Sequence, residues 1–189
     1  MIQFLIDNFN LTTEEANAFS VSFYEKDLLK GDVFIPYGKT CNRIGFVKKG
    51  ILKCVTLGKN KEVIDDFAFE NQFVTNYYSF LTETKSTKNI VCIDNCKLLI
   101  IDRKELHQLS KKHLFIEQIA RKVTEKLYLS LHQKINDLRL LTAEERYVQL
   151  FKNKKNIIAK IPQYDIASYL NVSPETVSRI RKKIALHLS

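Results

Sequence analysis

Three polar side chains near the end of the chain are of types that read the edges of DNA bases. Glu175, Ser178 and Arg179 lie in the segment SPETVSRIRKKI, residues 173–184. An arginine guanidinium can donate two hydrogen bonds to O6 and N7 of guanine, and a glutamate carboxylate can accept one from N4 of cytosine. Helical spacing places all three opposite the apolar residues of the segment. We therefore predict that they contact bases in a major groove.

Hydroxyl and ammonium groups around this segment suit the phosphate backbone of the same duplex. The last 50 residues, from Leu140 on, hold nine Lys or Arg against four acids, so positive charge is concentrated there. The whole chain of 189 residues has a formal net charge of +9, which favours a polyanionic partner. The predicted backbone contacts are Ser173, Thr176, Lys182 and Lys183, with Lys152, Lys154, Lys155 and Lys160 before them.

The spacing of apolar residues predicts that these side chains stand on a helix-turn-helix. Asn171 lies at the corner, where Asn tolerates a left-handed backbone, and Ser173 followed by Pro174 suits the start of the second helix. The alternative is an ordinary helical hairpin, in which Glu175 and Arg179 form only an ion pair. The apolar residues that would close the two helices on each other are Ile166, Leu170, Val172, Val177 and Ile180.

A different backbone chemistry precedes this region. All five glycines lie between Gly31 and Gly58, and short runs rich in Val, Ile and Phe alternate with turn residues from about Glu25 to Asp102. This pattern predicts an antiparallel β domain. Before it, Thr12 or Thr13 followed by acidic residues indicates a capped helix.

The segment from about Arg103 to Leu141 has no Gly or Pro and predicts a single long helix. Its apolar residues follow steps of three and four, so they form one stripe. We expect this stripe to mediate dimerisation; the alternative is a core helix packed only on its own sheet. A second capped helix is expected after Thr142. The predicted dimer contacts are Ile116, Ala120, Val123, Leu127 and Leu131.

An antiparallel β domain, one long helix and a helix-turn-helix reading SPETVSRIRKKI together resemble the Crp/Fnr superfamily of bacterial transcription regulators, over nearly the whole chain. ETVSR is the most specific motif, and FIPYGKTCNRIGFVKKGILKC is similar to the cyclic-nucleotide-binding roll of that family. The resemblance implies an α+β fold in three parts. These are a double-stranded β-roll sensor domain over residues 1–106, a dimerisation helix over 107–139 and a helix-turn-helix domain over 140–189. The Glu-x-x-Ser-Arg arrangement resembles the Fnr branch, which implies TTGAT-like half-sites.

The chain departs from the family where cyclic-nucleotide-binding members hold the cyclic phosphate. Those members use a Gly-Glu pair before a short helix and an Arg after it. The matching stretch, residues 69–90, has no Gly, and no Arg occurs between Arg43 and Arg103. We therefore expect that cyclic AMP does not control this protein. Another effector could occupy the pocket, or the roll could be vestigial with these side chains in its core and surface. The candidate pocket residues are Tyr77, Tyr78, Thr82, Ser86, Thr87 and Lys88.

The sequence predicts neither an enzyme nor a metal site. His107, His113 and His132 lie on the expected long helix and His187 near the end, so no strand carries a pair of metal ligands. A Gly-rich phosphate loop, a nucleophile elbow and a His-Glu-x-x-His motif are all absent. We expect no cofactor, although the sequence leaves open haem held by a single His or Cys. Cys41, Cys54, Cys92 and Cys96 are expected to be small buried thiols.

These observations predict a cytoplasmic regulator that binds double-stranded DNA at inverted repeats as a homodimer. No apolar run approaches the roughly 18 residues of a membrane helix, so no membrane contact is expected. RNA polymerase and an unidentified small effector are further candidate partners. Because the sequence closes on ALHLS, we expect no β-hairpin wing after the second helix of the motif. The alternative function is a small-ligand-binding or scaffolding β-roll that does not bind DNA.

Overall fold

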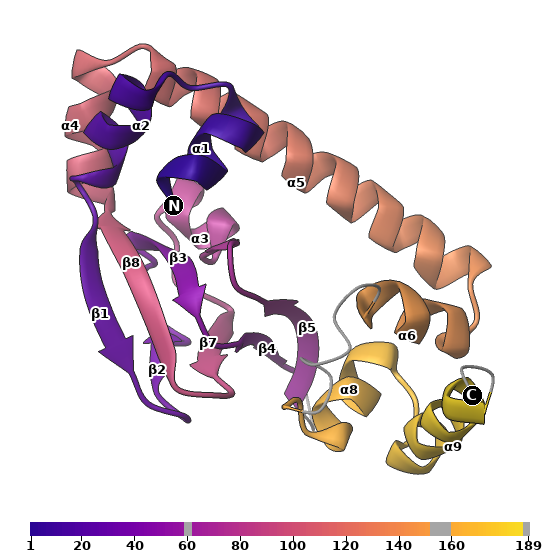
Figure 1. The fold of residues 1–189 in the computed structure, drawn as a ribbon. Coiled ribbons are helices and arrows are strands. Elements are labelled where there is room, and N and C mark those ends of the chain that lie inside the picture. Colours follow the sequence, from indigo (N-terminus) through magenta and orange to yellow (C-terminus); the bar gives the residue numbers. More distant parts are fainter. Residues whose placement is uncertain (59–61, 152–159, 187–189) are drawn as a thin grey trace.

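The computed structural model of the chain describes residues 1–58, 62–151 and 160–186, with side chains up to residue 184 in the last range. It has the α+β architecture that the sequence predicts: a β-roll, a long helix beside it, and a helical C-terminal part (Figure 1). None of the helices in these ranges combines the length and the apolar character needed to cross a membrane.

Two four-stranded antiparallel sheets make the roll, at the place where short β-rich runs alternate with turn residues. Their strand orders are β1-β8-β3-β6 and β2-β7-β4-β5. The roll confirms the predicted antiparallel β domain. The strands are β1 (Tyr24–Leu28), β2 (Val33–Ile35), β3 (Arg43–Lys49), β4 (Leu52–Leu57), β5 (Glu62–Ala68), β6 (Phe73–Val74), β7 (Lys88–Cys92) and β8 (Cys96–Asp102).

The inside of the roll is filled by side chains from both sheets. Phe80 from helix α3 (Tyr77–Thr82) joins Ile90, Leu98 and Ile100 in this core, and all four are buried. The core also contains the thiols of Cys41, Cys92 and Cys96, so the expectation that these are buried is confirmed. Burial likewise raises the pKa of the half-buried Cys54 thiol to about 12.

Gly50 occupies the turn between β3 and β4 because no side chain fits there. Its φ is +97°, and a Cβ at this position would lie 2.7 Å from both the carbonyl oxygen of Asn95 and the Sγ of Cys96. A substitution would therefore be strained in its backbone and would also collide with the start of β8. The Lys49-Gly50 pair marks this turn in the sequence.

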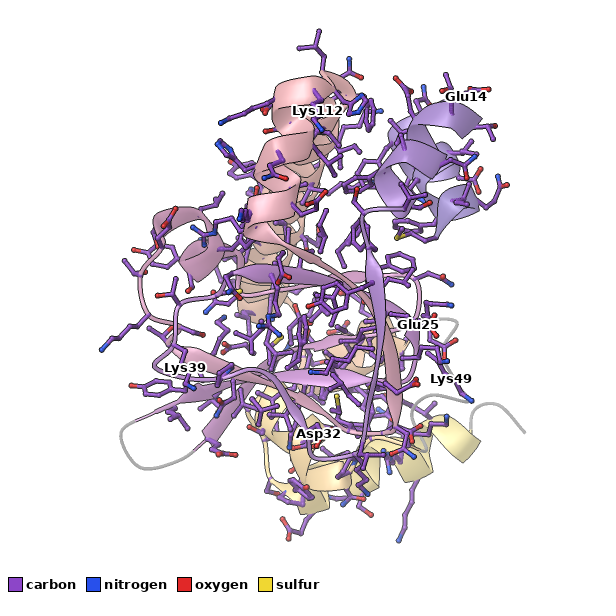
Figure 2. The ribbon with its side chains drawn as sticks, turned by 90° about the vertical axis from the view of Figure 1, so that its left-hand side faces the viewer. Glu14, Glu25, Asp32, Lys39, Lys49 and Lys112 are labelled. Atoms are coloured by element: carbon purple, nitrogen blue, oxygen red, sulfur yellow. The ribbon has the colours of Figure 1, made fainter. Side chains whose placement is uncertain are left out.

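Two short helices, α1 (Ile2–Phe9) and α2 (Thr13–Ser20), precede the roll. Thr12 is the N-cap of α2: its Oγ1 accepts a hydrogen bond from the Glu15 amide at 3.2 Å, and the Glu15 carboxylate accepts one from the Thr12 amide at 2.9 Å. This reciprocal capping confirms the predicted helix start. Figure 2 shows Glu14 on α2 and Lys112 at the end of α4 (Arg103–Lys112) at one end of the roll, with Asp32 at the other.

The prediction of a single long helix after the roll is wrong. The segment is divided into α4 and α5 (Phe115–Leu140), because His113 leaves the helical conformation with φ −136° and ψ 112°. The break lets Phe115, Ile116 and Ile119 turn into a cluster formed with α1 and α2. Tertiary burial of these three side chains therefore overrides the continuous helical pattern of the sequence.

Three described helices follow α5: α6 (Ala143–Phe151), α8 (Gln163–Leu170) and α9 (Pro174–Leu186). The predicted cap of α6 is confirmed, since Thr142 Oγ1 accepts a hydrogen bond from the Glu145 amide at 3.2 Å. The hydrogen bonds from Thr142 to the Glu145 carboxylate lower the pKa of that group.

Helix α8 packs directly on the second sheet of the roll. Side chains of β4 and β5 share one apolar cluster with α6, α8 and α9. Within this contact, Lys53 Nζ lies 2.7 Å from Asp165 Oδ1, and the Asp165 side chain is only 3% exposed. The Ile64 amide donates a hydrogen bond to Ser168 Oγ at 3.0 Å. A nearly dry ion pair and a backbone contact thus fix α8 against the sheet.

Replacing Lys53 by Met should destabilise the protein by about 3–5 kcal/mol, because it leaves the Asp165 carboxylate buried without a counter-charge. Lys48→Met is the matched control, since Lys48 pairs with Glu25 on the surface, where ion pairs contribute about 0–1 kcal/mol. Urea unfolding followed by circular dichroism measures both. The double variant Lys53→Met, Asp165→Leu should regain most of the lost stability. Equal losses for Lys53→Met and Lys48→Met would contradict this account of the contact.

Candidate nucleic-acid interface

Helices α8 and α9 meet at a tight left-handed corner. Asn171 has φ 55° and ψ 47°, and its amide donates a hydrogen bond to the Ser168 carbonyl at 3.2 Å. The Val172 amide donates to the Ala167 carbonyl at 3.0 Å. These bonds satisfy carbonyls that the end of a helix otherwise leaves unpaired. The structure therefore places a corner at the Asn that the sequence singles out.

An apolar seam holds the two helices together. Ile166, Leu170 and Val177 are fully buried, and Ile180 is nearly so. Ala167 also lies in the seam, where its small side chain lets the helices approach. This burial fixes the opposite face of α9 outward. The predicted helix-turn-helix packing is confirmed.

The start of α9 is capped as its sequence suggests. Ser173 Oγ accepts a hydrogen bond from the Thr176 amide at 3.3 Å, and Pro174 is the first helical residue. A hydrogen bond from Ser173 and the nearby Arg179 guanidinium lower the pKa of the Glu175 carboxyl. Glu175 thus remains an ionised acceptor at neutral pH.

The predicted base-reading side chains lie together on the outer face of α9. Glu175 and Arg179 are exposed, and Ser178 is half-buried between them. Arg179 Nη2 donates a hydrogen bond to Thr176 Oγ1 at 3.3 Å, so the guanidinium lies along the helix toward its N-terminus. The N-terminal part of a recognition helix is the part that meets base edges.

The predicted phosphate contacts are more scattered than the base-reading group. Lys182 is exposed on α9, whereas Lys183 pairs with Glu144 at 2.8 Å and Lys160 with Asp94 at 3.1 Å. Pairs on the surface contribute little, so a phosphate can replace either carboxylate. Lys152, Lys154 and Lys155 lie outside the described residues.

Arg181 on α9 has a role that the sequence did not suggest. Its Nε donates a hydrogen bond to the Tyr147 hydroxyl at 3.2 Å, which ties α9 to α6. Arg146 on α6 donates to the Leu170 carbonyl at 3.1 Å in the same way. Arg146 and Arg181 therefore bind groups of the protein itself. No local pattern in the sequence distinguishes these two arginines from the exposed Arg179.

The residues predicted to line an effector pocket do not converge on one site. Ser86 is buried, where its Oγ accepts a hydrogen bond from Asn76 Nδ2 and donates one to the Lys88 carbonyl, both at 2.7 Å. Lys88 pairs with Asp65 on β5 at 3.0 Å. The remaining members are Tyr77, which bonds to Thr124 on α5, and Tyr78, Thr82 and Thr87, which are exposed.

The Arg103 guanidinium, which the sequence did not single out, lies beside helix α3. Arg103, the first residue of α4, donates hydrogen bonds to the carbonyls of Cys41 at 2.7 Å and Ser79 at 3.4 Å. It also pairs with Glu83 at 2.6 Å and lies 4.7 Å above the Phe80 ring. Its distance in sequence from α3 hid this contact.

Metal binding finds no support in the described parts of the chain, where no three His, Cys, Asp or Glu side chains gather closely enough to hold an ion.

Comparisons with known proteins agree with this geometry. Residues 25–113 match the family model of the cyclic nucleotide-binding domain. The fold is similar to that of FixK2 from Bradyrhizobium japonicum, with a TM-score of 0.70, 17% identity, and coverage of 87% of this chain and 85% of that chain. The chain has the Crp/Fnr-type fold. The expected resemblance is therefore confirmed at the level of the fold.

Two further solved structures share the Crp/Fnr-type fold over 97% of this chain and 87% of their own. A transcriptional regulator of the Crp/Fnr family from Eubacterium rectale has a TM-score of 0.67 and 16% identity. The catabolite activator protein of Thermus thermophilus has a TM-score of 0.61 and 18% identity. No curated protein matches the sequence itself. The likeness in fold thus includes both the β-roll and the helix-turn-helix.

Asn171→Val should destabilise the helix-turn-helix by about 1–2 kcal/mol, because a β-branched side chain opposes the left-handed backbone that this corner requires. Asn171→Gly is the matched control and should remain within a few tenths of a kcal/mol, since Gly adopts positive φ freely. Thermal unfolding of both variants measures the difference. Equal stabilities would show that the corner does not depend on the conformation of residue 171.

Proposed function

We propose that the chain is a transcription regulator that binds specific inverted-repeat DNA sites as a homodimer. The observation that carries this proposal is the outer face of α9, where Glu175 and Arg179 are exposed above a fully buried seam. Acceptor and fork-shaped donor groups of this kind can read a G·C step in the major groove. The formal net charge of +9 supports a polyanionic partner.

Dimerisation is supported by the second half of α5. Leu127, Leu131, Ile135 and Leu138 are all exposed along one face of this helix. Ile116 is not part of that face, because it is buried in the chain's own N-terminal cluster. Of the other predicted dimer contacts, Ala120 is exposed and Val123 packs partly against the same cluster. The proposed interface therefore begins near Leu127.

The architecture of the proposed dimer sets the form of its DNA site. Two recognition helices enter successive major grooves about 34 Å apart, so the half-sites should be about one helical turn apart. In this proposal the division into sensor, dimerisation and DNA-binding parts follows the β-roll, α5 and the helices from α6 on. RNA polymerase remains a candidate partner of the bound dimer.

We propose further that cyclic AMP is not the effector. The Ser86 hydroxyl is buried and bonded within its own loop, and the roll interior is occupied by side chains. A cyclic phosphate would lose its hydration there without gaining a free guanidinium in return. A scaffolding roll without DNA function is less well supported, because it gives no reason for the exposed Glu175 and Arg179. Nothing in the proposal requires catalysis.

Arg179→Ala should weaken specific DNA binding by about 1–3 kcal/mol and relax base preference at one position of each half-site. Lys182→Ala is the matched control on the same helix, and it should weaken all sequences alike and reduce the salt dependence. Selection from random duplexes, followed by mobility shifts at several salt concentrations, measures both. An enriched motif that lacks two-fold symmetry, or one that Arg179→Ala leaves unchanged, would refute the proposal.

The double variant Leu131→Asp, Ile135→Asp should be monomeric, because each buried Leu or Ile contributes roughly 1.5–3 kcal/mol to the interface and a buried carboxylate opposes it. Leu129→Asp is the control, since Leu129 is also exposed but lies on the other side of α5. Sedimentation at micromolar concentration should give dimers for the wild type and the control. A monomeric wild type would count against dimerisation through α5.

A further inference from the structure

An apolar pocket of about 420 Å³ lies between α5 and the sensor part of the chain. Its walls come from α2 and the loop after it, from strands β3, β6 and β8, and from helices α3, α4 and α5. Ligand sites of this kind have volumes of about 300–1,000 Å³, mostly apolar walls and a few polar groups. Side chains that represent these walls are Phe23, Ile44, Leu81, Leu106, Ile119 and Val123.

The pocket is distinct from the interior of the roll. Phe80 stands between the two: it is part of the filled roll core and also lines the pocket. Of the predicted pocket residues, Tyr77 lines this space, whereas Tyr78, Thr82, Ser86, Thr87 and Lys88 do not. A ligand in this pocket would therefore contact α4 and α5 instead of the loop that holds Ser86.

Three ionisable side chains, Arg103, His107 and Glu117, are among the residues that line this mostly apolar space. The Arg103 guanidinium has its Nε buried without a hydrogen-bond partner in the described structure. An unsatisfied buried donor is unfavourable, and it is a reason to expect an acceptor there. Its ion-pair partner Glu83 is 72% exposed, so that pair contributes little and another carboxylate can replace it.

We propose that this pocket binds a small apolar molecule with one carboxylate, such as a medium-chain fatty acid, and that its carboxylate pairs with Arg103. The apolar part lies along Leu106, Ile119 and Val123. Binding transfers this part from water to an apolar wall, and the guanidinium gains an acceptor.

The position of the pocket gives the ligand a route to regulation, and this step rests on the proposed function. Val123 and Leu127 line the pocket, and Leu127 also begins the exposed stripe of α5. An occupied pocket would hold α5 against the roll at the point where the proposed dimer interface starts. The ligand should therefore favour one arrangement of the DNA-binding helices over others.

Calorimetry of the full chain with decanoate, and with decanol as the uncharged control, tests the binding. Decanoate should bind with one site per chain, and decanol at least tenfold more weakly. Arg103→Gln should weaken decanoate binding by about 10- to 100-fold, whereas Arg121→Gln, an exposed arginine on α5, should not change it. Glu83→Gln should strengthen binding by about two- to fivefold, because it removes the competing carboxylate. No saturable binding, or equal binding of decanol, overturns the proposal.

A second pair of variants tests the same site without changing Arg103, so the test does not depend on the folding of Arg103→Gln. Ser110 lines the pocket on α4, and Gln108 lies two residues earlier but does not line it. Ser110→Phe should narrow the pocket and weaken decanoate binding about tenfold or more, and Gln108→Phe should leave it unchanged. Circular dichroism verifies the fold of each variant. Equal binding by both variants would place decanoate elsewhere.

Two further measurements separate this inference from the proposed function. If the second copy of the chain fills the pocket instead, decanoate should dissociate dimers in sedimentation, and that result overturns the proposal. Mobility shifts with and without decanoate report on DNA separately. DNA binding without decanoate binding would refute only the ligand site, and decanoate binding without DNA binding would refute only the regulator.

Discussion

The burial of Phe115, Ile116 and Ile119 among the N-terminal helices is the constraint on which the rest of this molecule depends. These three side chains fix the first turns of α5 at one end of the roll (Figure 1). A rigid helix extends from that fixed point, so its direction determines which of its residues meet water and where the C-terminal helices lie. The pocket beneath α5 and the exposed stripe beyond it are both consequences of the same anchor.

A second contact, between helix α8 and the sheet, fixes the position of the C-terminal helices. Helix α8 shares an apolar cluster with β4 and β5, so the C-terminal helices are not held by the end of α5 alone. Burial of Tyr169 at this contact, with Asp66 nearby, raises its pKa to about 12. The β-roll and the C-terminal helices are thus joined at two places, through α5 and through the face of the sheet. A displacement of α5 would therefore also strain the contact between α8 and the sheet, and a displacement of α8 would strain α5.

Local chemistry made much of this structure predictable. The cap at Thr12, the corner at Asn171 and the buried seam of the helix-turn-helix each follow from residue types within one or two turns of a helix. The break at His113 did not follow, because it is caused by apolar residues of α1 and α2 about a hundred positions away. Arg103 and Asp165 were missed for the same reason: their partners lie on other elements. Arg103 and Asp165 differ from exposed arginines and aspartates only in which groups lie near them in space, and the residue type alone does not reveal this.

The pairing of Asp165 with Lys53 has a consequence for how α8 docks on the sheet. One carboxylate oxygen meets Lys53, and the other is buried without a hydrogen bond in the described structure. Such a group adds little net stability, but it strongly disfavours every docking position in which the two charges do not meet. The Lys53–Asp165 pair and the hydrogen bond between Ile64 and Ser168 therefore favour the observed position of α8 on the sheet, although the ion pair itself adds little to stability.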